Sequence, residues 1–214
     1  MKLKPLLALA AAFSLAGCAG PATPAPTVTV TQIVTVSPDA EEATAEAAAE
    51  EEPAEDTPAD GIYSVGQKAT NFGAEVTVKK AYVAKTVPIN KSGYRAGSGY
   101  DTYTDVKPDD GGKFLVVETS IKNTGKKSMD LTCGYPLDIK AGDTEDRAYD
   151  TIDSLYEYKG NPECNAQLQP GFKDKMTYVF MAPKDAELTG FVFRDTNNDV
   201  YNDYTGVRFD KPLK

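Results

Sequence analysis

The sequence predicts an all-β protein in which one antiparallel β-sandwich or barrel follows an export signal and a disordered acidic linker. Three observations carry this prediction. Short β-branched or aromatic runs alternate with turn clusters over residues 61–214, no long segment has helical periodicity, and residues 1–60 have the composition of a signal and a spacer.

The first segment, 1–18, is predicted to be a secretory signal peptide. Two lysines near the start precede an apolar run that is too short to span a membrane and ends in small residues. The residues Leu15-Ala16-Gly17-Cys18 resemble the lipobox of bacterial lipoproteins, in which the cysteine receives a diacylglyceryl thioether. The resemblance implies that Cys18 carries palmitate-like chains and anchors the protein on the extracytoplasmic face of the cell membrane. An ordinary signal peptide with an incidental cysteine is disfavoured, because the apolar run, the small residues and the cysteine follow one another at the spacing of a lipobox.

The second segment, 19–60, is predicted to be a disordered tether rich in Pro, Thr, Ala and Glu. It holds ten acidic residues and no Lys or Arg. Such a composition buries too little apolar surface to offset the entropy of ordering, and like-charge repulsion keeps it extended. Residues 27–36 alternate like a strand, but prolines flank them, so a tether remains the preferred interpretation.

The third segment, 61–214, is expected to form one β-rich domain. Within 113–122, Phe114 and Val116 alternate with Leu115 and Val117, as they do in a strand. Turn signals such as Asn123-Thr124-Gly125 separate the runs. A few helical turns are possible near 143–158. The predicted strands are 74–83, 113–122, 128–132, 137–140, 173–180, 190–193 and 206–209.

Several of these runs also resemble a known family. The domain opens with Tyr63-Ser64-Val65-Gly66, the strand from Lys113 leads into Lys122-Asn123-Thr124-Gly125, and Phe191-Val192-Phe193-Arg194-Asp195 comes late. Together they resemble the telokin-like, immunoglobulin-like extracellular domain of actinobacterial and firmicute lipoproteins, a family of unknown function. The resemblance implies an immunoglobulin-like antiparallel β-sandwich and supplies no catalytic residues. Segments 88–112 and 141–165 are longer than the family pattern needs.

Composition excludes several classes of function. The chain of 214 residues contains no His, which removes mechanisms built on imidazole, and its net charge of −9 argues against a nucleic-acid partner. No spacing singles out a Ser-Lys or paired-carboxylate arrangement. We therefore expect no enzymatic activity and no cofactor, with a His-free hydrolase as the least favoured hypothesis.

The two remaining cysteines, Cys133 and Cys164, are predicted to form a disulfide, because an even pair in an exported domain is usually bonded. Two separate buried thiols are the alternative. The pair does not form a C-x-x-C motif, so a redox role is disfavoured.

Segment 88–112 contains the candidate ligand-binding residues Tyr94, Arg95, Tyr100 and Tyr103, interleaved with glycines. Tyr with Gly and Ser is typical of adaptable binding loops, because flat amphipathic rings bind at low entropy cost. The same composition suits stacking on a carbohydrate. A poorly ordered insertion is the simpler interpretation of a loop this long, so both remain open.

Two acidic segments suggest the alternative that calcium binds or stabilises the domain. The first, 141–165, contains Asp143, Glu145, Asp146, Asp150, Asp153, Glu157 and Glu163. The second contains Asp195, Asn197, Asp199 and Asp203, which match the start of an EF-hand loop. Val200 replaces the glycine of that loop and Gly206 its bidentate glutamate, so a hairpin turn is preferred and no metal site is assigned.

The sequence therefore predicts a lipid-anchored, extracytoplasmic lipoprotein whose sandwich is a non-enzymatic binding module at the cell surface. Its expected partners are the membrane, through the N-terminal lipid, and a cell-envelope protein or glycan. The alternative is a calcium-binding or calcium-stabilised cell-envelope domain.

Overall fold

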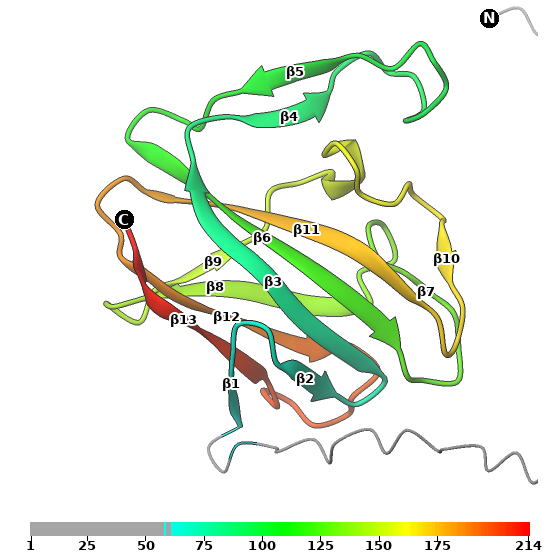
Figure 1. Cartoon of the computed structure of the whole chain (residues 1–214), viewed down its shortest axis with the longest axis vertical. Coiled ribbons are helices and arrows are strands. Elements are labelled where there is room, and N and C mark those ends of the chain that lie inside the picture. Colours follow the sequence, from blue (N-terminus) through cyan, green and yellow to red (C-terminus); the bar gives the residue numbers. More distant parts are fainter. Residues whose placement is uncertain (1–57, 59–60) are drawn as a thin grey trace, which may run out of the picture. The chain divides into compact units, whose positions relative to one another are not determined.

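The computed structural model describes Pro58 and residues 61–214, and these form a β-sandwich of two facing sheets (Figure 1). In spatial order, the five-stranded sheet contains β1 (Ile62–Ser64), β13 (Thr205–Leu213), β12 (Leu188–Asp195), β8 (Leu137–Asp143) and β9 (Ala148–Asp150). The four-stranded sheet contains β11 (Lys173–Pro183), β6 (Gly112–Asn123), β3 (Ala74–Ala84) and β2 (Lys68–Asn71).

Two small ribbons complete the fold. The first pairs β4 (Val87–Asn90) with β5 (Tyr103–Val106), and the second pairs β7 (Met129–Asp130) with β10 (Gln167–Leu168). The predicted signal peptide, Cys18 and all of the predicted tether except Pro58 lie outside the described residues. Within the part of the chain that the structure describes, no helix is long and apolar enough to cross a membrane.

Aromatic side chains from both sheets meet in the core. The Phe191 ring of β12 lies 5.9 Å from the Tyr178 ring of β11 and 6.4 Å from the Phe180 ring, between ring centroids. Phe193 stacks on Phe191 at 6.0 Å, and all four side chains are buried. Because these residues alternate along β11 and β12, one face of each strand points into the core. This is the pattern expected of a half-buried sheet.

The β-sandwich predicted from sequence is confirmed, with corrections in detail. Each predicted strand overlaps an observed one, although 128–132 shrinks to the two residues of β7. The predicted helical turns near 143–158 reduce to one 3₁₀ turn, η1 (Leu155–Glu157). The sandwich is not wholly antiparallel, because β1 pairs with β13 in parallel.

The outer face of β6 is covered rather than exposed. Phe114 and Val116, on the face opposite Leu115 and Val117, are 4% and 1% exposed. In β4, Val87 and Ile89 are buried too, and both belong to the same core cluster. The insertion that begins at residue 88 therefore contains a packed hairpin, and only its tip is a loop.

A buried asparagine explains the Lys122-Asn123-Thr124-Gly125 motif. The Asn123 amide donates to the carbonyls of Lys127 and Leu168 at 2.8 and 2.9 Å, and its oxygen accepts from the Gly125 N–H at 3.0 Å. An alanine at this position would leave buried carbonyls without donors. The Asn123 side chain thus joins its own turn to Lys127 and to Leu168 of β10.

Candidate functional site

The candidate site is a hollow of about 580 Å³ at the end of the sandwich that carries β4, β5 and η1 (Figure 1). Its walls come from the loop that joins β4 to β5 and from the segment 156–166. The side chains that line it include Asn90, Tyr94, Arg95, Tyr156, Glu157 and Glu163.

Backbone pairing brings the two walls together. Ile89 forms an isolated antiparallel bridge with Tyr158, and the Lys159 N–H donates to the Pro88 carbonyl at 3.1 Å. Because Ile89 is also buried against the sheet, the base of the hairpin is fixed beside η1. The hollow therefore stands on rigid backbone although its rim is a loop.

The loop tip is folded on itself through Asn90. The Asn90 amide donates to the Tyr94 carbonyl at 2.8 Å, and its oxygen accepts from the Ser92 N–H at 3.1 Å and the Ser92 hydroxyl at 2.6 Å. The rings of Tyr94 and Tyr100 lie 5.7 Å apart and tilted, and both are largely exposed, at 60% and 73%. Two aromatic faces thus stand beside the hollow and are available to a ligand.

The charged groups around the hollow neutralise one another. Lys91 forms an ion pair with Glu157 at 3.3 Å, and Arg95 forms a short one with Glu163. Backbone hydrogen bonds, the largest from Gly97, lower the pKa of the nearby Asp101 carboxyl. The two ion pairs cancel four of these charges, and Asp101 remains as one negative charge nearby. The hollow therefore offers aromatic faces to a ligand and has no positive excess to attract an anionic one.

The structure brings together only part of the predicted binding set. Tyr94 and Arg95 line the hollow, whereas Tyr100 does not line it and only packs against the Tyr94 ring. Tyr103 does not line it. Tyr103 lies in β5, where the Lys159 ammonium is 5.5 Å from the centroid of its ring. Burial, and to a smaller extent the charge of Asp101, raises the pKa of Tyr103.

Sequence reasoning missed the second wall of the hollow. Tyr156 and Glu163 belong to a stretch that the sequence marked only as acidic, far along the chain from the tyrosines. The available signal was Cys164, which lines the hollow itself. A disulfide at Cys164 indicated an ordered segment, but nothing in the sequence placed that segment beside Tyr94.

The structure joins Cys133 to Cys164 in a disulfide, with 5.2 Å between the Cα atoms. The carboxylate of Asp130 reinforces this link, because it accepts the N–H groups of Cys133 and Asn165 at 3.1 and 2.8 Å. Burial acts to raise the pKa of Asp130, but these hydrogen bonds outweigh it and lower the pKa. The second wall of the hollow is therefore fastened at one end.

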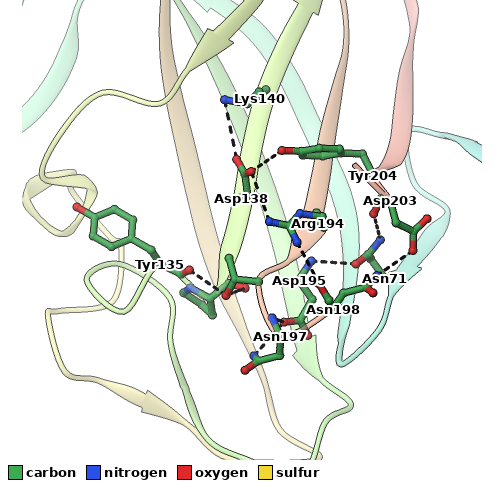
Figure 2. Close-up of polar contacts among 12 residues, drawn as sticks. Asn71, Tyr135, Asp138, Lys140, Arg194, Asp195, Asn197, Asn198, Asp203 and Tyr204 are labelled. Carbon is green, nitrogen blue, oxygen red and sulfur yellow. Dashed lines mark hydrogen bonds and ion pairs between the residues drawn. The ribbon is translucent and has the colours of Figure 1, made fainter. Parts of the chain in front are cut away.

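The acids of the two calcium candidates are not gathered into a site. Within residues 61–214 no group of three or more acidic or cysteine side chains is placed to hold a metal. In the second candidate, Asp195 accepts from Asn197 at 2.8 and 3.0 Å, and Asp203 accepts from the Asn198 amide at 2.8 Å (Figure 2). These side chains build a turn, as the preferred interpretation of 195–203 expects.

Asp143, the first acid of the other candidate, is a buried structural anion. It accepts hydrogen bonds from the Tyr149 hydroxyl and the Arg147 side chain, each at 2.7 Å, and from the Glu145 N–H at 2.9 Å. Burial acts to raise its pKa, but the hydrogen bonds of Tyr149 and Arg147 hold it well below the usual range. Burial and the bond to Asp143 raise the pKa of Tyr149 to about 12.

This arrangement predicts acid sensitivity. Because the pKa of Asp143 is lowered by folding, its contribution to stability is present above the unfolded pKa, about 3.9, and is lost as the pH falls below it. We expect the free energy of unfolding of the wild type to fall more steeply below about pH 4 than that of Asp143→Asn, as measured by urea denaturation at a series of pH values. Asp150→Asn removes an exposed acid of the same segment and is the matched control. Parallel profiles for wild type and Asp143→Asn would contradict the prediction.

Comparison with known proteins gives a family and several similar folds. The model of a family described as "Domain of unknown function (DUF4352)" matches residues 63–203. Among solved structures, an uncharacterized β-sandwich protein of Clostridium difficile 630 is 17% identical with a TM-score of 0.46, and the match covers 72% of this chain and 93% of that one. A conserved hypothetical protein of Bacillus anthracis is 20% identical with a TM-score of 0.44, over 71% and 95%.

A Bacillus subtilis protein called a "putative lipoprotein" is 17% identical with a TM-score of 0.39, and the match covers 68% of this chain and 38% of that one. No curated protein matches the chain. Likenesses of this extent carry no information on ligand or activity.

Proposed function

The chain belongs to the DUF4352 family, and we propose that it is a lipid-anchored extracytoplasmic lipoprotein whose sandwich is a non-enzymatic module that binds glycan. The proposed anchor is Cys18, supported by the Leu15-Ala16-Gly17-Cys18 lipobox. The proposed domain type is telokin-like and immunoglobulin-like, supported by the motif that ends at Gly125.

The observation that carries the binding role is the hollow with two exposed tyrosine rings on a fixed hairpin. Sugar rings present apolar faces and many hydroxyls, so they are held by aromatic faces together with uncharged hydrogen-bonding groups. Tyr94 and Tyr100 supply the faces, and the exposed Asn165 lines the hollow with an uncharged amide. Because Arg95 is already paired with Glu163, charge contributes little to selection, which favours a neutral glycan over an ionic ligand.

The test uses insoluble cell-wall sacculi in co-sedimentation and a hexamer of N-acetylglucosamine in calorimetry. We expect the double variant Tyr94→Ser, Tyr100→Ser to bind about fivefold to a hundredfold more weakly, since each aromatic contact contributes about 0.5–1.5 kcal/mol. Tyr135→Ser is the matched control, because Tyr135 is 71% exposed and does not line the hollow. Equal binding by both variants, or none by the wild type, would contradict the proposal.

The anchor is tested separately by mass spectrometry of the N-terminal peptide from membranes. The proposal expects cleavage before Cys18 and the added mass of a diacylglyceryl group. A Cys18→Ser chain should lack both. An unmodified Cys18 in the wild type would contradict the anchor and leave the binding proposal untouched.

A further inference from the structure

A second group of exposed aromatic side chains lies at the end of the sandwich away from β4 and β5. Phe72, in the turn between β2 and β3, is 68% exposed, and Phe172, just before β11, is 66% exposed. Figure 1 shows both turns at the end where β6 finishes. Large exposed apolar side chains that gather at one place indicate a surface that is covered in use.

Backbone hydrogen bonds hold these two phenylalanines beside the same turn, 123–125. The N–H groups of Thr124 and Gly125 donate to the Gly73 carbonyl at 2.9 and 3.0 Å, next to Phe72. The Asn123 N–H donates to the Phe172 carbonyl at 2.9 Å. The turn 123–125 is therefore hydrogen-bonded to the backbone at both aromatic positions.

The backbone at Phe72 is unfavourable for a bulky residue. Its φ of 48° lies in the left-handed region, which Gly, Asn and Asp adopt most easily. The Gly73 N–H donates to Asp195 Oδ2 at 3.0 Å, and Asn71, which accepts from the Asp195 N–H at 2.9 Å (Figure 2), holds the other side of the turn. Burial in the core does not offset this unfavourable backbone conformation, because the Phe72 ring is largely exposed. The exposed ring is therefore a candidate for a role outside the core.

Exposed lysines lie near each of the two phenylalanines. Lys126, Lys127 and Lys173 are exposed, and none of them has an ion-pair partner among the described residues. A hollow of about 570 Å³ lies here, lined by Phe72 and by Lys126 and Lys127. Lys122 stands opposite Lys173 in the sheet register and adds a fourth positive charge. The acids beside them are the buried Asp195, which also lines the hollow, and Glu75 and Asp174. We call Phe72, Lys126, Lys127, Phe172 and Lys173 the aromatic–lysine end.

The chain enters the domain at this same end. The Gly61 carbonyl accepts from the Gly206 N–H at 3.4 Å, and the adjacent Thr205 hydroxyl donates to the Thr70 carbonyl at 3.0 Å. The entry point at Gly61 is thus separated from β2, which leads to Phe72, by a single strand. The segment that carries Cys18 joins the domain beside the aromatic–lysine end.

We propose that the aromatic–lysine end docks on the surface of an anionic phospholipid bilayer. The two phenylalanines enter the boundary between headgroups and acyl chains, and the lysines pair with lipid phosphates. This inference depends on the proposed anchor in one respect, which is that the anchor raises the local concentration of membrane around the domain. Docking directs the hollow at Tyr94 away from the bilayer, because β4 and β5 lie at the other end of the sandwich (Figure 1).

The chain contains no Trp, so one introduced indole reports its own depth in the membrane. The lipoprotein is reconstituted into phosphatidylglycerol vesicles that contain brominated acyl chains, with phosphatidylcholine vesicles as the neutral arm. We expect the emission of Phe72→Trp to be quenched by at least half in the anionic vesicles and little in the neutral ones. Tyr94→Trp, at the other end, is the matched control and is expected to keep its emission.

Charge reversal provides the second arm. In the Phe72→Trp background, Lys126→Glu with Lys127→Glu should weaken the docking at least tenfold and abolish the quenching in anionic vesicles. Flotation of the same samples measures, independently of quenching, whether the lipid anchor holds the protein on the vesicles. Protein that floats without quenching at position 72, or with equal quenching at 72 and 94, overturns the docking while the anchor stands. The protein that lacks the lipid is also titrated with excess anionic vesicles. If the indole at position 72 is not quenched there, the docking is likewise overturned.

Discussion

Replacing Phe191 by alanine is expected to destabilise the domain by about 3–5 kcal/mol, the range for large aromatic residues removed from a well-packed core. Phe191 is 1% exposed and its ring contacts three other aromatic rings, those of Tyr178, Phe180 and Phe193. Because these rings come from both sheets, the cavity opens between the layers, where neither sheet can close it without moving as a whole. Chemical denaturation followed by far-ultraviolet circular dichroism measures the change.

The matched control for Phe191→Ala is Phe72→Ala. It removes the same side chain from a position that is 68% exposed, so it is expected to change the free energy of unfolding by less than about 0.5 kcal/mol. Similar losses in both variants would mean that Phe191 does not occupy the centre of the core. A selective loss at Phe191 supports the inward face assigned to β12.

Removing the disulfide is expected to destabilise the domain by about 3.7 kcal/mol in the chain-entropy description of a closed loop. Cys133 and Cys164 are 31 residues apart in the sequence. The double variant Cys133→Ser, Cys164→Ser should unfold at lower denaturant concentration than the wild type, and reductant should shift the wild type toward the variant but leave the variant unchanged. Insensitivity of the wild type to reductant would contradict the prediction.

The same variant has a local consequence at the candidate site. Cys164 lines the hollow and Asn165 is held by Asp130, so loss of the bond frees the wall that faces Tyr94. We therefore expect glycan binding to weaken under conditions where the variant is still folded. A variant that keeps full affinity would show that the hairpin wall alone holds the ligand.

The sandwich was predictable because its long strands carry a clear alternation. The runs 113–122 and 173–180 became the paired strands β6 and β11, with Tyr178 opposite Val117 as the inward faces require. The short strands β1, β2, β4, β5, β9 and β10 were missed, because two to four residues are too few to establish a period. The parallel pairing of β1 with β13 was missed because strand direction depends on where the two ends of the domain meet.

By itself, the sequence determined which residues are apolar in alternation, where the turns fall, which two cysteines were available to pair and which loop concentrates tyrosines. These properties are local, and each depends on a few neighbouring residues. Only the tertiary structure decided what those residues face. Ile89 is paired with Tyr158, Gly73 with Asp195, and Asn123 with Phe172 through contacts between distant parts of the chain. Register and sheet packing set such contacts, and for that reason both the hollow at Tyr94 and the aromatic–lysine end emerged only from the fold.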